Sequence, residues 1–262
     1  MTASTPLRTR ARPVSRPGRR RPAPPALVLV AHGSRDPRAL TTVRALLDRV
    51  RALRPGLPVR LGHIELTEPL LPDTLAALGA PRAVLVPLLL GRGYHVKQDI
   101  PELAAAAPVP ASVAAPLGPH PLLAEALHAR LTQAGWPAAL DGTARRTTAV
   151  VLAAAGSRDP DSATDTRRTA RLLAGRLGVP VVPAYASAAN PTVPTALRAL
   201  AARGRHRVAV ASYFTAPGRF ATQCASQAPW IASAPLGAHE AMARLVLHRY
   251  EQSAALPGTS AA

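Results

Sequence analysis

The chain has 262 residues, of which 48% are hydrophobic and 18% charged, so it can bury a core and is not a disordered polyelectrolyte. Lysine and arginine number 32 against 14 acidic residues, a formal net charge of +18, although Lys97 is the only lysine. Cys224 is the only cysteine, which excludes an intrachain disulfide and a cysteine-rich zinc site, and 3% aromatic residues argue against a stacking surface for single-stranded nucleic acid.

The first segment, residues 1–25, is predicted to be a disordered basic tail, because it holds seven arginines, no acidic residue and many prolines. Its arginines precede an apolar stretch of about six residues, which is shorter than the 7–15 residues of a secretory signal. No apolar run reaches the roughly 20 residues that cross a membrane. We therefore expect a cytoplasmic protein. The arginine excess is explained either by compositional bias or by an anionic partner.

The sequence repeats itself, which predicts two copies of one structural unit. Three motifs recur in the same order at offsets of 123, 122 and 119 residues: 32–37 at 155–160, 69–72 at 191–194, and 116–120 at 235–239. We predict a first unit over 26–134, a linker over 135–147, a second unit over 148–252 and a flexible end over 253–262.

Strands and helices alternate in each predicted unit, which indicates an α/β fold with a small parallel sheet flanked by helices. In the first unit, strands are predicted over 26–31, 59–64, 83–88 and 113–115. A helix is predicted after Asp36, with Pro37 in its first position, and further helices over 69–78, from about residue 98, and along 122–131. Ligands bind at the carboxyl ends of such strands, so we expect the units to face each other across a cleft.

Ionisable side chains follow three successive strands of the first unit. His32 follows the first strand, Glu65 and Glu68 follow the second, and His95 lies in the glycine-rich loop after the third. Imidazole and carboxylate groups suit a borderline divalent metal, and they also serve as general acids and bases. We expect the two histidines and a carboxylate to converge on one rim of the sheet. The competing interpretation is that each residue only makes a local hydrogen bond. We favour this interpretation less for three residues at successive strand ends than we would for a single histidine.

The second unit lacks this ionisable set. Ala155, Ser187, Asn190 and Phe220 stand where the first unit has His32, Glu65, Glu68 and His95, whereas the glycines, prolines and leucines of the scaffold persist. A structural role for the set would have preserved it in both copies. We therefore predict one active unit and one unit that supplies architecture and a wall of the cleft.

The segments 30–35 (VAHGSR), 65–69 (ELTEP) and 86–101 are similar to motifs of the sirohydrochlorin chelatases, which are class II cobalt/iron chelatases. The resemblance covers about residues 26 to 250 and is to the long form with two fused units. It implies two chelatase-like (flavodoxin-like) units, insertion of Fe²⁺ or Co²⁺ into sirohydrochlorin with release of two protons, and no cofactor beyond the metal substrate. It also implies a monomer in which the two units form an internal pseudo-dimer.

The resemblance implies that His32, Glu65 and His95 form the catalytic and metal-handling trio. We expect the histidines to ligate the metal and accept pyrrole protons while Glu65 assists. The implied substrate carries eight carboxylates, so Ser34, Arg35 and Arg92 are candidate substrate contacts. Either arginine could equally be a surface charge.

Other histidines are interpreted as structural: His63 as a packed core residue, and His120 and His239 as residues at helix starts. A nickel or protoporphyrin chelatase of the same fold is an alternative function. A nucleic-acid-binding protein, which the charge motivates, would show salt-dependent DNA binding that survives removal of the tail, and we do not favour it. A phosphohistidine phosphatase is discounted because Ala31 stands where arginine is expected. The physiological metal, and the choice between sirohaem and cobalamin pathways, stay open.

Overall fold

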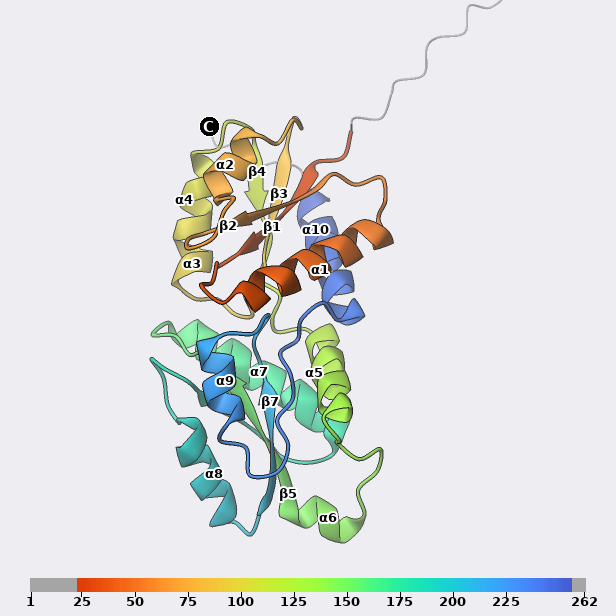
Figure 1. Ribbon diagram of the computed structural model, residues 1–262, viewed down its shortest axis with the longest axis vertical. Helices are drawn as coiled ribbons and strands as arrows, with labels where there is room; N and C mark the ends of the chain where they lie inside the picture. The colour runs from red at the N-terminus through yellow and green to blue at the C-terminus, as the bar shows by residue number, and fades with distance from the viewer. Residues whose placement is uncertain (1–22, 256–262) are drawn as a thin grey trace, which may run out of the picture.

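The computed structural model describes residues 23–255, which form two α/β lobes, each built on its own parallel sheet (Figure 1). Nearly all of the predicted basic tail and most of the predicted flexible end lie outside these residues. Within them, no helix combines the length and apolar character needed to cross a membrane. The predicted α/β class with two parallel-sheet units is confirmed.

The first sheet has four parallel strands in the order β2-β1-β3-β4. Every residue of the central strand β1 is buried, as expected where helices cover both faces of a sheet. The strands are β1 (Ala26–Ala31), β2 (Val59–His63), β3 (Ala83–Pro87) and β4 (Ala111–Val113). The helices between them are α1 (Pro37–Leu53), α2 (Leu71–Ala76), α3 (Tyr94–Lys97) and α4 (Asp99–Ala105).

The second sheet has three parallel strands in the order β6-β5-β7, with a single parallel bridge from Val210 to Ala232 where the first sheet has a fourth strand. The strands are β5 (Thr148–Ala154), β6 (Val181–Tyr185) and β7 (Arg207–Ser212). The helices are α7 (Pro160–Leu177), α8 (Val193–Ala201) and α9 (Arg219–Ala225). The second unit is thus a shortened copy of the first.

Capping residues begin the equivalent helices of both units as the repeat predicts. Asp36 accepts a hydrogen bond from the Arg38 amide at the start of α1, and Asp159 accepts one from the Asp161 amide at the start of α7. A proline occupies the first turn of each helix, where its missing N–H has no cost. The spacing of apolar residues then buries one face of α1, at Val43, Leu46, Leu47 and Val50.

Some predicted bounds differ from the structure. β4 begins and ends two residues earlier than predicted, and α2 covers only the middle of the predicted helix. Two helices were not predicted: the short α3, and α6 (Gly142–Thr147), which lies within the predicted linker. The Asp141 carboxylate caps α6 by accepting a hydrogen bond from the Ala144 amide, a signal present in the sequence.

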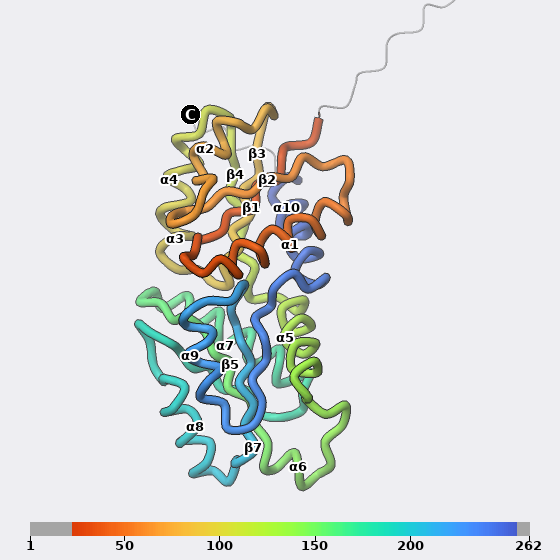
Figure 2. Tube along the Cα trace, viewed as in Figure 1, coloured from red at the N-terminus to blue at the C-terminus, as the bar shows by residue number. Residues whose placement is uncertain are grey.

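The last helix of each repeat packs on the other repeat. The helix α5 (Pro121–Gln133) lies against α7 and β7, whereas α10 (Glu240–Ala254) lies against α1 and β3. Figures 1 and 2 show α10 beside α1 in one lobe and α5 in the other lobe. One continuous hydrophobic core includes Leu29 of the first sheet and Leu152 of the second. The exchange therefore interlocks the lobes and fixes the walls of the space between them.

Three histidines have the structural roles predicted for them. The Nδ1 atoms of His120 and His239 accept hydrogen bonds from the Leu122 and Ala241 amides at the starts of α5 and α10. His63 is 2% exposed within β2. These rings therefore serve the scaffold, although His63, at the end of β2, also lines the cavity between the units.

Candidate active site

The three ionisable residues predicted to converge lie together beyond the carboxyl ends of the first sheet. The rings of His32 and His95 meet edge to face with their centroids 4.6 Å apart. His32 Nε2 lies 3.6 Å from Glu65 Oε1, and these two side chains are 42% and 50% exposed. The groups are therefore close to one another and open to a ligand from solvent.

A close approach between two loops places His32 beside Glu65. The Glu65 amide donates a hydrogen bond to the His32 carbonyl, and Gly33 adopts a φ of +103° between them. A Cβ atom on Gly33 would lie 1.7 Å from the Glu65 carbonyl oxygen, so only glycine fits. The Thr67 hydroxyl donates to the Ser34 carbonyl and accepts from the Ser34 amide, which fastens the same loops a second time.

His95 lies on the short helix α3, and a carboxylate fixes its ring. His95 Nδ1 lies 2.5 Å from Asp99 Oδ2. This contact favours a proton on Nδ1 and leaves Nε2 as the nitrogen for a metal ion or a proton. Asp99 was not singled out from the sequence, because His95 was predicted to lie in a loop and Asp99 begins the separate helix α4.

The trio is not a ready-made metal centre. Within residues 23–255, no group of three or more His, Cys, Asp or Glu side chains is arranged to hold a metal ion. The predicted donors are therefore adjacent in space without forming a three-ligand site. Their types still suit a borderline divalent metal, which imidazole and carboxylate both bind.

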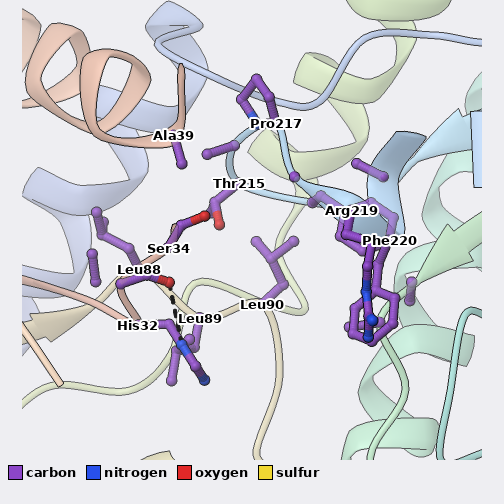
Figure 3. Close-up of a pocket in the computed structure, with 18 of the residues that line it drawn as sticks. His32, Ser34, Ala39, Leu88, Leu89, Leu90, Thr215, Pro217, Arg219 and Phe220 are labelled. Atoms are coloured by element: carbon purple, nitrogen blue, oxygen red, sulfur yellow. Dashed lines mark hydrogen bonds between the residues drawn. The ribbon is translucent and has the colours of Figure 1, made fainter. Parts of the chain in front are cut away.

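A cavity of about 1420 Å³ opens between the two units beside the trio. It is larger than the roughly 300–1,000 Å³ of most small-molecule sites. Figure 3 shows His32 and Ser34 on one side, Arg219 and Phe220 on the opposite side, and Leu90 between them. The cavity can therefore enclose a large molecule that touches both units, with His32 and His95 on one wall and Arg219 on the other.

Matching hydrogen bonds show which residues of the second unit occupy the equivalent places. The Ser187 amide donates to the Ala155 carbonyl, as the Glu65 amide does to the His32 carbonyl in the first unit. The glycines that begin α3 and α9 are Gly93 and Gly218, so Phe220 takes the place of His95, two residues later. The second wall therefore presents methyl, hydroxyl and phenyl groups at the places equivalent to the trio, of which His32 and His95 line the first wall.

Arg219 is a candidate functional residue that sequence reasoning missed. It is exposed and lines the cavity, with its guanidinium 4.8 Å from the centre of the Phe220 ring. Its position immediately before Phe220 in the repeat was the available signal. An arginine on this wall can pair with a carboxylate of a ligand held between the units.

The predicted substrate contacts separate into two groups in the structure. Ser34 and Arg35 line the cavity. Arg92 instead donates from its side chain to both carboxylate oxygens of Asp165 in α7, at 3.0 and 2.8 Å. Gly91 and Gly93 line the cavity, but Arg92 is not among its lining residues. Since its guanidinium is already paired, we do not include Arg92 among the proposed substrate contacts.

Two parallel-sheet units share a cavity at their strand ends, and two imidazoles line it beside a carboxylate, an arrangement that defines a two-unit protein of the chelatase fold. The CbiX family model matches residues 26–134 and 149–253. The chain belongs to the CbiX family, which confirms the relationship to sirohydrochlorin chelatases predicted from the motifs.

Curated relatives carry chelatase names. A sirohydrochlorin cobaltochelatase of Methanococcus aeolicus is 36% identical over 81 residues, covering 30% of this chain and 57% of that protein. A sirohydrochlorin ferrochelatase of Bacillus subtilis is 32% identical over 176 residues, covering 63% of this chain and 64% of that protein. The chain thus matches less than two thirds of the length of these relatives.

Solved structures show the same architecture. The structure described as SirB from Bacillus subtilis with Fe³⁺ superposes with a TM-score of 0.70 at 27% identity, covering 88% of this chain and 96% of that one. A structure of CbiX described as the terminal enzyme of sirohaem biosynthesis in denitrifying bacteria gives a TM-score of 0.64 at 22% identity, which supports the fold alone. The two-unit arrangement is therefore shared over almost the whole described chain.

Proposed function

We propose that this protein is a metal chelatase that inserts Fe²⁺ or Co²⁺ into sirohydrochlorin. The observation that carries the proposal is the contact of His32 with both Glu65 and His95, where the two histidines line the cavity between the units. The names of its relatives, sirohydrochlorin cobaltochelatase and ferrochelatase, give the substrate class. The reaction joins one divalent metal to four ring nitrogens and releases two pyrrole protons.

The trio has a role in each part of this reaction. His32 and His95 ligate the incoming metal through ring nitrogens, and the same nitrogens accept the two pyrrole protons after the metal has passed to the macrocycle, because neutral imidazole is both a metal ligand and a base. Glu65 offsets the charge of the metal beside His32. A metal that leaves within the product needs an open, loose site, and the half-exposed side chains suit such a transfer. No resident cofactor is required, since the metal itself is a substrate.

Contacts to the tetrapyrrole come from both walls in this proposal. Ser34 and Arg35 approach it from the first unit and Arg219 from the second. Arginine pairs with carboxylates through two parallel hydrogen bonds, which orients a polycarboxylate ring as well as binding it. Phe220 offers an apolar face beside Arg219.

The assembly belongs to the same proposal. The units over 26–134 and 148–252 act together as a monomer, with the exchanged helices α5 and α10 making an internal pseudo-dimer. The cavity is complete within one chain, which supports this reading. We also propose that the protein works in the cytoplasm.

An anaerobic insertion assay tests the function. Purified protein is mixed with sirohydrochlorin and Fe²⁺, Co²⁺ or Ni²⁺, and insertion is followed by absorbance against the uncatalysed rate. We expect acceleration with Fe²⁺ or Co²⁺, and loss of most of it in His32→Ala and His95→Ala. His128→Ala, which removes a histidine of α5 outside the cavity lining, is the matched control. Full rates in both site variants would refute the assigned residues, and preference for protoporphyrin or Ni²⁺ would favour the alternative chelatase.

A further inference from the structure

A buried carboxylate of the second unit holds the segment that carries His95. The side chain of Asp165 in α7 is 1% exposed. It accepts hydrogen bonds from the Arg92 backbone amide at 3.0 Å, from Nε at 3.0 Å and from Nη2 at 2.8 Å. Because both the main chain and the side chain of Arg92 are bound, the position of the loop is fixed three residues before His95.

The same segment is held again on the other side of His95. Lys97 Nζ lies 2.6 Å from Asp159 Oδ2 and 2.9 Å from Asp161 Oδ2, both at the start of α7. The hydroxyl of the buried Tyr213 donates to the Leu90 carbonyl at 2.9 Å, further back in the loop. Contacts from the second unit therefore bracket the short helix that presents His95.

The repeat shows that these contacts are not a property of the shared scaffold. Both α1 and α7 begin after an aspartate cap followed by proline, so their residues pair at an offset of 123. The places of Asp161 and Asp165 in α7 are taken by Arg38 and Thr42 in α1. The acidic partners Asp161 and Asp165 thus exist in one copy, whereas the cap Asp159 has an aspartate counterpart in Asp36.

The basic partners also exist in one copy only. Gly93 and Gly218 begin α3 and α9, which pairs the two loops at an offset of 125. Where the first loop has Arg92 and Lys97, the second has Pro217 and Thr222. The equivalent ion pairs cannot form around Phe220. The second unit therefore holds the loop that carries His95, whereas the first unit does not hold the equivalent loop around Phe220 with such ion pairs.

We infer that the unit without the ionisable trio serves as a brace for His95, and that Asp165 is a positioning residue acting through Arg92. Hydrogen bonding to Asp165 raises the pKa of Arg92, so the guanidinium stays charged at any working pH. A misplacement of about 1 Å in a reacting group costs on the order of a hundredfold in rate. The effect on catalysis rests on the proposed insertion activity, whereas the effect on loop order does not.

Asp165→Asn in the full chain tests the inference with two readouts. Hydrogen–deuterium exchange followed by mass spectrometry should show faster exchange in the peptide covering 91–98. The insertion kcat should fall by about tenfold to a hundredfold, with the KM for sirohydrochlorin changed by less than about twofold. Glu125→Gln is the matched control, because it removes an exposed ion pair with Arg244 between α5 and α10, away from His95.

A second variant guards against a folding defect. Arg92→Met combined with Asp165→Leu replaces the ion pair by apolar side chains, an exchange that other proteins tolerate with stability intact. It should reproduce the faster exchange of 91–98 and the lower kcat. Unchanged exchange in both variants, or faster exchange with an unchanged kcat, would overturn the inference. If the wild type inserts no metal, the proposed function fails. Hydrogen exchange of the peptide 91–98, together with binding of Co²⁺ alone, then still tests whether Asp165 holds the loop that carries His95.

Discussion

His95 of α3 and Asp99, the first residue of α4, form a pair in which Nδ1 and Oδ2 lie 2.5 Å apart. Such a carboxylate orients an imidazole and selects which nitrogen carries its proton. Asp99 thereby fixes the orientation of the His95 ring, which meets the His32 ring edge to face. Asp99 is therefore a fourth member of the cluster around His32, Glu65 and His95, and the repeat comparison alone did not select it.

Asp99→Ala should lower the insertion rate without removing a group that touches the metal. Loss of such an orienting partner costs about tenfold to a hundredfold in other metal sites. Steady-state rates in the anaerobic assay measure the effect, and Asp99→Asn should lie between Ala and wild type because its amide oxygen still accepts a hydrogen bond. Glu102→Gln, an exposed change on the same helix, is the control. A wild-type rate in Asp99→Ala would contradict the orienting role.

The convergence of two histidines and a carboxylate could be predicted from strand order, because parallel strands end at one edge of a sheet. The choice of Glu65 rather than Glu68 came from the resemblance to the chelatase motifs. The caps at Asp36 and Asp159 were equally local, since each depends on residues within one turn. Periodicity and capping chemistry are short-range signals, and here they were sufficient.

The helix exchange and the partner of Arg92 could not be predicted in this way. An apolar stripe on α5 or α10 shows that one face is buried but not which sheet covers it. Asp165 lies 73 residues from Arg92 in the sequence, on the other unit. In a sequence, an arginine that is exposed to solvent cannot be distinguished from one that is paired with an acidic residue, because the pairing depends on tertiary packing.

Gly33→Ala and Gly156→Ala should destabilise the protein similarly but differ in activity. The added Cβ would lie 1.7 Å from the Glu65 carbonyl oxygen in one variant and 1.9 Å from that of Ser187 in the other. Both glycines also have positive φ, which disfavours alanine. We expect each variant to lose roughly 2 kcal/mol of unfolding free energy, as measured by chemical denaturation.

Only Gly33→Ala should then lower the insertion rate of the remaining folded protein, because it moves Glu65 away from His32. Gly156→Ala is its internal control, since the loop it disturbs carries Ser187 in place of a carboxylate. Equal losses of kcat in the two variants, after correction for folded fraction, would show that the second loop contributes to the chemistry.

Arg219→Ala should weaken binding of the tetrapyrrole more than it slows insertion. The guanidinium lines the wall opposite His32, so its removal takes away a carboxylate partner without touching the metal-handling groups. We expect the KM for sirohydrochlorin to rise by about tenfold, the equivalent of a charge-assisted hydrogen bond, with kcat retained. Phe220→Ala should likewise spare the metal step. A fall in kcat with an unchanged KM for Arg219→Ala would exclude the binding role.

Protonation of the two histidine caps should make the protein less stable in mild acid. Burial, reinforced by Arg249 at His120 and by Arg130 at His239, lowers the pKa of both rings. The unfolded chain therefore binds protons more readily than the folded one, so this stability is present above about pH 6.5 and is lost as pH falls through the lowered folded pKa values. Protonated Nδ1 also cannot accept the amide of Leu122 or Ala241.

Thermal unfolding of His239→Asn between about pH 5.5 and 7.5 checks this explanation. Asparagine caps a helix without titrating, so the variant should retain its Tm at neutral pH and lose less stability in acid than the wild type. His239→Ala should instead lose about 1 kcal/mol at neutral pH, the usual value of a cap. His206→Asn replaces an exposed histidine that caps neither α5 nor α10, and it should keep the wild-type slope. If His239→Asn and wild type show the same fall in Tm with acid, the pH dependence arises elsewhere than at this cap.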